Sequence, residues 1–184
     1  MKRVKPVPVT LLAHIVTLKS VALARYNMTR VEHKTITFSA GSKSLLIDKA
    51  VLAPVPKRLL LTMVKNADFI GTVDTNPFKF QHYEISDFSL FVNGKQYRND
   101  GLFLGIDHEK TSVMGYRTLF EGSGIHHPNA GRQITHDKFV NVYFMLLFDL
   151  THVQDASEAH TSHPEQGNIR VELHYPKRLR ACCT

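Results

Sequence analysis

The chain has 184 residues, of which 43% are hydrophobic and 21% charged, and its formal net charge is +7. This balance is typical of a globular protein with one sizeable core, and it excludes an intrinsically disordered chain. No apolar run reaches the length of a membrane-spanning helix, so we expect no membrane partner.

The first predicted element is a short helix over residues 9–22, where apolar residues recur with helical spacing after Pro8. Residues 1–18 also place basic residues before apolar ones, as a secretory signal does. Pro6 and Pro8 separate the two groups, His14 interrupts the apolar stretch, and no small-x-small cleavage site follows. We therefore expect a helix of the folded protein.

Three segments that follow are rich in apolar or β-forming residues: 25–39 with TITF at 35–38, 44–52, and 58–64. The first predicts a strand, and Pro54 and Pro56 separate the other two. Segment 58–64 is short and lies between turn residues, which predicts a strand buried on both faces. Residues 65–77 carry Gly, Asp, Asn and Pro, so we expect a loop there.

The strongest local signal is a β-hairpin over residues 87–97. Asn93-Gly94 tolerates positive φ at both central positions of a type I′ turn, whose twist matches that of paired strands. Phe88, Leu90 and Val92 alternate with their neighbours and predict the core face of the first strand.

The rest of the chain predicts two weak helices and two strands separated by loops. The helices are expected at 108–122 and 137–143, the strands at 144–150 and 169–175, and a long polar loop at 151–166. Regular helical crossovers between buried strands are missing, which disfavours a βαβ fold. The pattern indicates a mainly β protein, an antiparallel sandwich with long loops and a few short helices.

Candidate chemistry is sparse, and we predict no catalytic, cofactor-binding or metal-binding residues. His160 and His163 have ligand-like spacing, with Glu158 and Glu165 close by, but a solvated polar loop explains them better. Nucleophile-elbow and phosphate-loop motifs are absent from the sequence. Because no active-site motif is found, we do not expect an enzyme. Cys182 and Cys183 are adjacent and cannot cross-link the fold, so a reducing compartment is expected.

Charge is uneven along the chain. Residues 1–66 hold twelve Lys/Arg and two Asp/Glu, a net of +10, whereas residues 67–184 hold eleven and fourteen, a net of −3. This basic third could contact nucleic acid, although solvation of loops and strand edges is the favoured alternative. Aromatic and cationic residues also alternate at 78–83 in the manner of single-strand binders, but packing of the aromatic rings under the hairpin is again favoured.

Seven segments, in the same order along the chain, resemble the capsid-like proteins of Polinton/Maverick-type transposons. They are VTLLAHIVTL (9–18), KTITF (34–38), PVPKRLLLTMVKNADFIGTVDTNPFKFQHY (54–83), VNGKQY (92–97), GYRTLFEGSGIHH (115–127), YFMLLFDLT (143–151) and GNIRVELHY (167–175). The resemblance implies a jelly-roll domain over residues 1–176 followed by a frayed tail at 177–184. Family members stack two jelly rolls per chain, so this chain resembles the later one and is expected to be truncated at both ends.

The resemblance also implies a structural function without catalysis. It predicts a homo-oligomer, trimeric in the family, or contacts with other capsid-like subunits, in the cytoplasm, the nucleus or a virion-like particle. A missing last strand would leave an unpaired sheet edge. The alternatives are a nucleic-acid-binding protein that uses the basic N-terminal third, and, by fold analogy alone, a sugar- or ligand-binding jelly roll.

Overall fold

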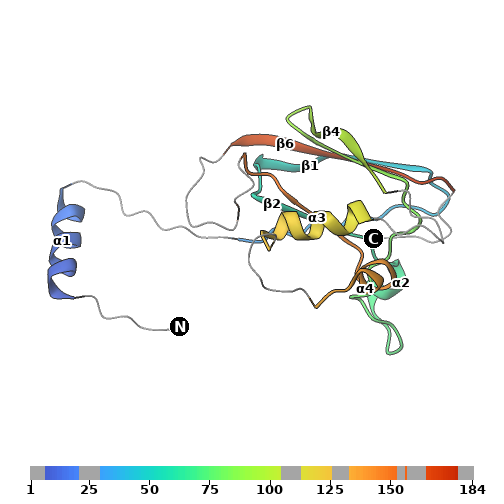
Figure 1. Cartoon of the computed structure of the whole chain (residues 1–184), viewed down its shortest axis with the longest axis horizontal. Helices are drawn as coiled ribbons and strands as arrows, with labels where there is room; N and C mark the ends of the chain where they lie inside the picture. The colour runs from blue at the N-terminus through green and yellow to red at the C-terminus, as the bar shows by residue number, and fades with distance from the viewer. Residues whose placement is uncertain are drawn as a thin grey trace. The chain divides into compact units, whose positions relative to one another are not determined.

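The computed structural model describes residues 7–20, 30–104, 113–125, 133–152, 156 and 165–177 (Figure 1). Contacts divide the chain into two compact units, residues 1–33 and residues 34–184. The sequence had predicted one domain over residues 1–176. The polar loop at 151–166 and the tail at 177–184 lie largely outside the described residues.

The described residues of the N-terminal unit contain the helix α1 (Pro8–Lys19), which confirms the helix predicted near 9–22. Pro8 occupies the first turn, where a missing N–H costs nothing. None of the residues of α1 is buried.

The strand predicted at 35–38 is wrong. Residues 30–37 have no regular secondary structure, and Phe38 forms only a single-residue bridge while its side chain joins the core. β-branched residues form a strand only where a neighbouring strand offers a row of backbone hydrogen-bond partners. Strand propensity by itself does not provide that neighbouring strand.

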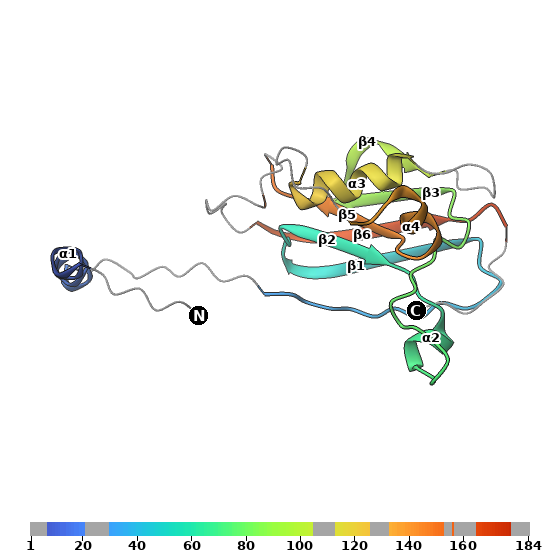
Figure 2. The ribbon, with the colours of Figure 1, turned by 60° about the horizontal axis from the view of Figure 1, so that its bottom comes forward.

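Six antiparallel strands build the second unit, in a four-stranded and a two-stranded sheet (Figure 2). The first has the order β1 (Ser44–Pro54), β6 (Gln166–His174), β3 (Asp87–Val92), β4 (Lys95–Phe103); the second pairs β2 (Arg58–Thr62) with β5 (Met145–Asp149). The mainly antiparallel sheet structure with a few short helices is confirmed. The jelly roll, which has eight strands, stays a prediction, because the described residues hold these six.

The predicted hairpin joins β3 and β4. Asn93 and Gly94 have φ of 52° and 77°, both positive, as a type I′ turn requires. Asn93 also accepts a hydrogen bond from the Asn168 backbone N–H, 3.0 Å, which ties the turn to β6. β1 and β4 each carry a register irregularity; in β1 it includes Lys49, at φ 54°.

The core lies between the two sheets. Phe88 of β3 stacks on Phe148 of β5 with ring centroids 5.0 Å apart and planes 7° from parallel. Tyr97 of β4 meets the edge of Phe148, and its hydroxyl donates to the Asp149 carbonyl. Ile169, Val171 and Leu173 of β6 complete this layer. The core-facing alternation predicted for β3 is confirmed for Phe88 and Leu90, both fully buried.

Two short helices lie on this side of the second unit: the first packs on the opposite face of β5 as a third layer, and the second contacts the first. They are α3 (Val113–Ser123) and α4 (His136–Asn141), close to the helices predicted at 108–122 and 137–143. The buried face of α3 is made of Gly115, Thr118, Leu119 and Gly122, a helical spacing of mostly small residues. Tyr116 of α3 contacts Phe139 of α4 edge-on, with centroids 5.4 Å apart, which joins the two helices.

Two expectations about the region before the hairpin are wrong. Strand β2 is not buried on both faces, because the Leu60 side chain is 56% exposed. Helix α3 covers the outer face of β5 and does not extend over β2. The segment 65–77 is not only a loop, because it contains a helix of five residues, α2 (Asn66–Ile70). The first error arises because burial depends on which neighbouring element covers a strand, and local composition does not encode that.

Gly122 allows the close approach of α3 to β5. A Cβ atom built there would lie 2.5 Å from the Leu147 carbonyl oxygen, a backbone atom that cannot move aside cheaply. We expect Gly122→Ala to lower the free energy of unfolding by about 1–3 kcal/mol through overpacking, although Ala favours a helix. Arg117→Ala on the exposed face of α3 is the control, with a change within about 0.5 kcal/mol. Chemical denaturation measures both; equal midpoints would contradict this account of the helix packing.

Asp149 organises the end of β5. Its buried carboxylate accepts from the Thr151 N–H (3.0 Å) and hydroxyl (2.6 Å), and from the Ala156 N–H (2.9 Å). We expect Asp149→Ala to cost about 1–3 kcal/mol, because three partly buried donors lose their acceptor. Asp74→Ala, at an exposed loop position, should change stability by less than about 0.5 kcal/mol. Thermal and denaturant unfolding compare them, and an unaffected Asp149→Ala protein would show that water replaces the carboxylate.

Candidate interaction surfaces

Titratable residues do not converge on a reaction centre in the part of the chain that is described. No group of three or more His, Cys, Asp or Glu is placed there to hold a metal ion. His160, His163, Glu158, Cys182 and Cys183 lie outside the described residues. Glu165, the remaining member of the histidine constellation, accepts a hydrogen bond from the Asn93 side chain at 3.0 Å and so supports the hairpin turn.

A small open hollow of about 250 Å³ lies between residues 81–84 and helix α4. It is lined by Gln81, His82, Tyr83, Glu84, Val140 and Asn141. His82 accepts a hydrogen bond from the Glu84 N–H at 3.0 Å, and Glu84 lies 3.8 Å from the Lys177 ammonium. These contacts stabilise a tight turn, in which Tyr83 and Glu84 both have positive φ. The hollow is thus a depression at the surface beside this turn, and its polar residues serve the turn's own structure.

The aromatic segment at 78–83 is divided between core and surface. Phe80 and Tyr83 are half-buried, and Phe80 bridges Tyr143 next to β5. Phe78 is 67% exposed, so the favoured packing of these rings as core is wrong for Phe78. Lys79 is exposed beside it. The surface of this segment thus carries one exposed ring beside one cation, whereas single-strand binders stack successive bases on several aromatic side chains.

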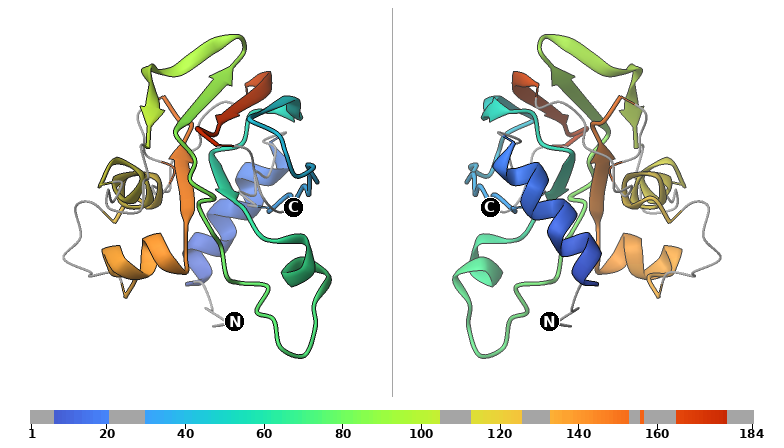
Figure 3. Two further views of the ribbon diagram at one scale, coloured as in Figure 1. Left: turned by 90° about the vertical axis from the view of Figure 1, so that its right-hand side faces the viewer. Right: turned by 90° about the vertical axis from the view of Figure 1, so that its left-hand side faces the viewer.

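In the described part of the second unit, exposed apolar side chains gather on a projecting segment, residues 66–80, which we name the α2 arm. Helix α2 and the loop after it extend away from the sheets in every view (Figure 3). Phe69, Ile70, Val73 and Phe78 all expose large fractions of their side chains, 74% for Ile70 and the whole of Val73. Monomeric proteins seldom gather apolar side chains on a projection without a partner.

Hydrogen bonds within the α2 arm give it a defined shape. The Thr75 hydroxyl accepts from the Thr72 N–H at 3.0 Å, and the Asn76 side chain accepts from the Phe78 N–H at 3.0 Å. Gly71, at φ 83°, ends the helix in a conformation that side-chain-bearing residues avoid. A segment that already has a defined conformation loses less conformational entropy when it binds, which favours binding to a partner.

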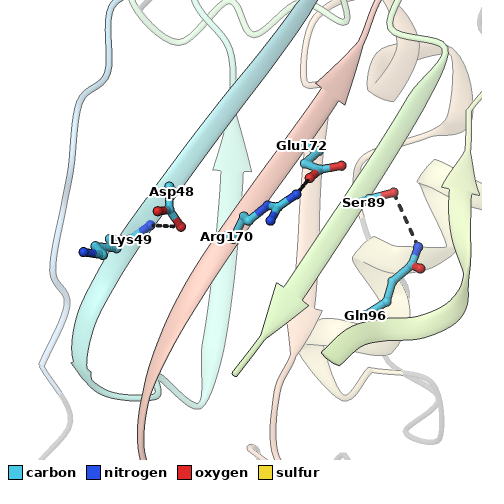
Figure 4. A network of polar contacts seen from close by, with 6 residues as sticks. All are labelled: Asp48, Lys49, Ser89, Gln96, Arg170 and Glu172. Carbon is cyan, nitrogen blue, oxygen red and sulfur yellow. Dashed lines mark hydrogen bonds and ion pairs between the residues drawn. The ribbon is translucent and has the colours of Figure 1, made fainter. Parts of the chain in front are cut away.

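The outer face of the four-stranded sheet is mostly polar. Arg170 and Glu172 form an ion pair along β6, and Gln96 lies 3.5 Å from the Ser89 hydroxyl on the neighbouring strand (Figure 4). The Arg170 guanidinium also lies 5.0 Å above the ring of Phe91. Leu46 is the exposed apolar exception on this face. One solvated face is ordinary for an antiparallel sheet.

Within the described residues, no helix has both the length and the apolar character to cross a membrane. Comparison with protein-family models, with curated proteins and with solved structures finds no match. The resemblance to transposon capsid proteins therefore stays a prediction.

The α2 arm was not predicted from the sequence, although its residue composition is unusual for a loop. Residues 69–78 hold four large apolar side chains among Gly, Thr, Asp, Asn and Pro, a mixture that suits neither a core element nor a solvated loop. Such a mixture indicates a surface segment with a binding role.

Proposed function

We propose that this chain is a structural, capsid-like protein that acts through contacts between subunits, with a sandwich derived from the jelly roll of Polinton/Maverick-type transposons. The α2 arm carries the proposal, because four large apolar side chains are exposed on a segment whose backbone projects from the sandwich (Figure 3). The ordered sequence resemblance along most of the chain supports the ancestry.

The area of the α2 arm is sufficient for a specific contact. The exposed parts of Phe69, Ile70, Val73 and Phe78 amount to roughly 500 Å², given that a buried aromatic ring contributes about 150–250 Å². Burying this surface on two subunits reaches the approximately 1,000 Å² that a specific interface needs. Both edge strands of the four-stranded sheet carry irregularities, which disfavour edge-to-edge pairing of that sheet.

The test is assembly of the full chain, measured by light scattering and electron microscopy over a range of concentrations. We expect oligomers, and we expect the double substitution Ile70→Asp/Val73→Asp to weaken association by at least about tenfold, because it places two charges in an apolar contact. Leu46→Asp, which introduces a charge on the sheet face, is the matched control and should assemble normally. A monomer at high concentration, or an arm variant that assembles like the wild type, would reject the proposal.

A second candidate is nucleic-acid binding by the basic first third. The observation that favours it is an excess of exposed basic residues over residues 34–66, which hold a single acidic residue, Asp48. The exposed basic residues are Lys34, Lys43, Lys49, Lys57, Arg58 and Lys65. Exposed cations of this number would release counterions from a phosphate backbone.

Anisotropy titrations of labelled DNA at several salt concentrations test this candidate. Affinity should fall as salt rises, and Lys43→Glu/Lys49→Glu should weaken binding uniformly across sequences by several-fold. Lys138→Glu, an exposed change on α4, is the control. Salt-independent binding, or none at low salt, excludes the nucleic-acid function.

A further inference from the structure

The β3–β4 turn contains the only Asn-Gly pair in the sequence, Asn93-Gly94. Asparagine is chemically labile when glycine follows it, because glycine has no side chain to hinder attack by its own backbone nitrogen on the asparagine carboxamide. Both residues are exposed, so water reaches the Asn93 side chain. Within the described part of the chain the Gly94 N–H donates no hydrogen bond, so no acceptor restrains the attacking nitrogen.

The Asn93 carboxamide is held by residues around the start of β6. Its Nδ2 donates to Glu165 Oε1 at 3.0 Å, and its Oδ1 accepts from the Asn168 N–H at 3.0 Å. The Asn93 backbone N–H also donates to the Asn168 carbonyl at 3.0 Å. Gly167 lies against the carboxamide, because a Cβ atom built there would come within 2.3 Å of Asn93 Oδ1. The side chain of Asn93 thus links the hairpin turn to β6.

Deamidation requires the carboxamide to leave this position. The Gly94 backbone nitrogen bonds to Asn93 Cγ and gives up its proton, the Cγ–Nδ2 bond breaks, and Nδ2 leaves as ammonia. Water then opens the resulting cyclic imide at either of its carbonyls, which gives aspartate or isoaspartate. Water is consumed and ammonia released, and no oxidant or reductant takes part. Because Cγ must approach Gly94 while the hydrogen bonds direct the carboxamide toward β6, those bonds raise the barrier.

We propose that Asn93 is a deamidation site whose reaction Glu165 holds back, and that the product weakens the link between the hairpin turn and β6. The new carboxylate takes the place of the Nδ2 donor, which lies 3.0 Å from Glu165. Two carboxylates so close repel each other and share no hydrogen. Isoaspartate also routes the main chain through Cβ, which the two-residue turn does not accommodate. This modification is independent of the proposed structural function.

The rate is measured on the full chain, incubated at mildly alkaline pH, by mass spectrometry of the tryptic peptide 80–95. We expect deamidation at Asn93, and Glu165→Ala should speed it at least about threefold, because Nδ2 loses its acceptor. Glu165→Gln is the matched control: its side-chain oxygen still accepts, so its rate should stay within about twofold of the wild type. In concentrated urea, where residues 93 and 165 separate, all three chains should react at the same rate.

A pair of variants tests the consequence of the modification. Asn93→Asp should lower the midpoint of chemical denaturation, and Asn93→Asp/Glu165→Gln should regain part of that loss, because an amide donates to the new carboxylate. Three results would each overturn the proposal: no deamidation at Asn93, a folded Glu165→Ala chain that reacts no faster than the wild type, or the same midpoint loss from Asn93→Asp with Glu165 and with Gln at that position. A rate difference that persists in urea would overturn it too.

Discussion

The apolar layer between the two sheets, centred on the stacked rings of Phe88 and Phe148, is the interaction on which the rest of the sandwich depends. It determines which side of each strand faces inward, because side chains alternate along a strand and a slip by one residue would expose the whole inner set. β6 lies between β1 and β3, and its inward residues Ile169, Val171 and Leu173 connect the two halves of the larger sheet to that layer.

The inward orientation of β5 in the smaller sheet also determines where helix α3 packs. Leu146 and Phe148 face the interior, so Leu147 faces the opposite way, against Gly122 of α3. α3 thus covers β5, while Leu60 of β2 stays exposed. A sheet of two strands is too narrow to be covered completely by the helices on its outer face. Apolar side chains such as Leu60 therefore stay exposed beyond the edge of the helix layer.

In the described part of the second unit, exposed apolar side chains gather on the α2 arm, outside the core. The arm has an internally hydrogen-bonded shape and little net charge, which suits a complementary protein surface.

The sequence alone determined the elements whose signal is local. Asn93-Gly94 specifies its turn by backbone sterics, the alternation of Phe88 and Leu90 marks the inner face, and Pro8 with the apolar spacing after it marks α1. Only the tertiary structure decided that residues 35–37 have no regular secondary structure, that β2 is covered on one side, and that the four large apolar side chains of the α2 arm are exposed. The reason is physical: turn and periodicity signals depend on neighbouring residues, whereas burial depends on which distant element occupies the space beside a side chain.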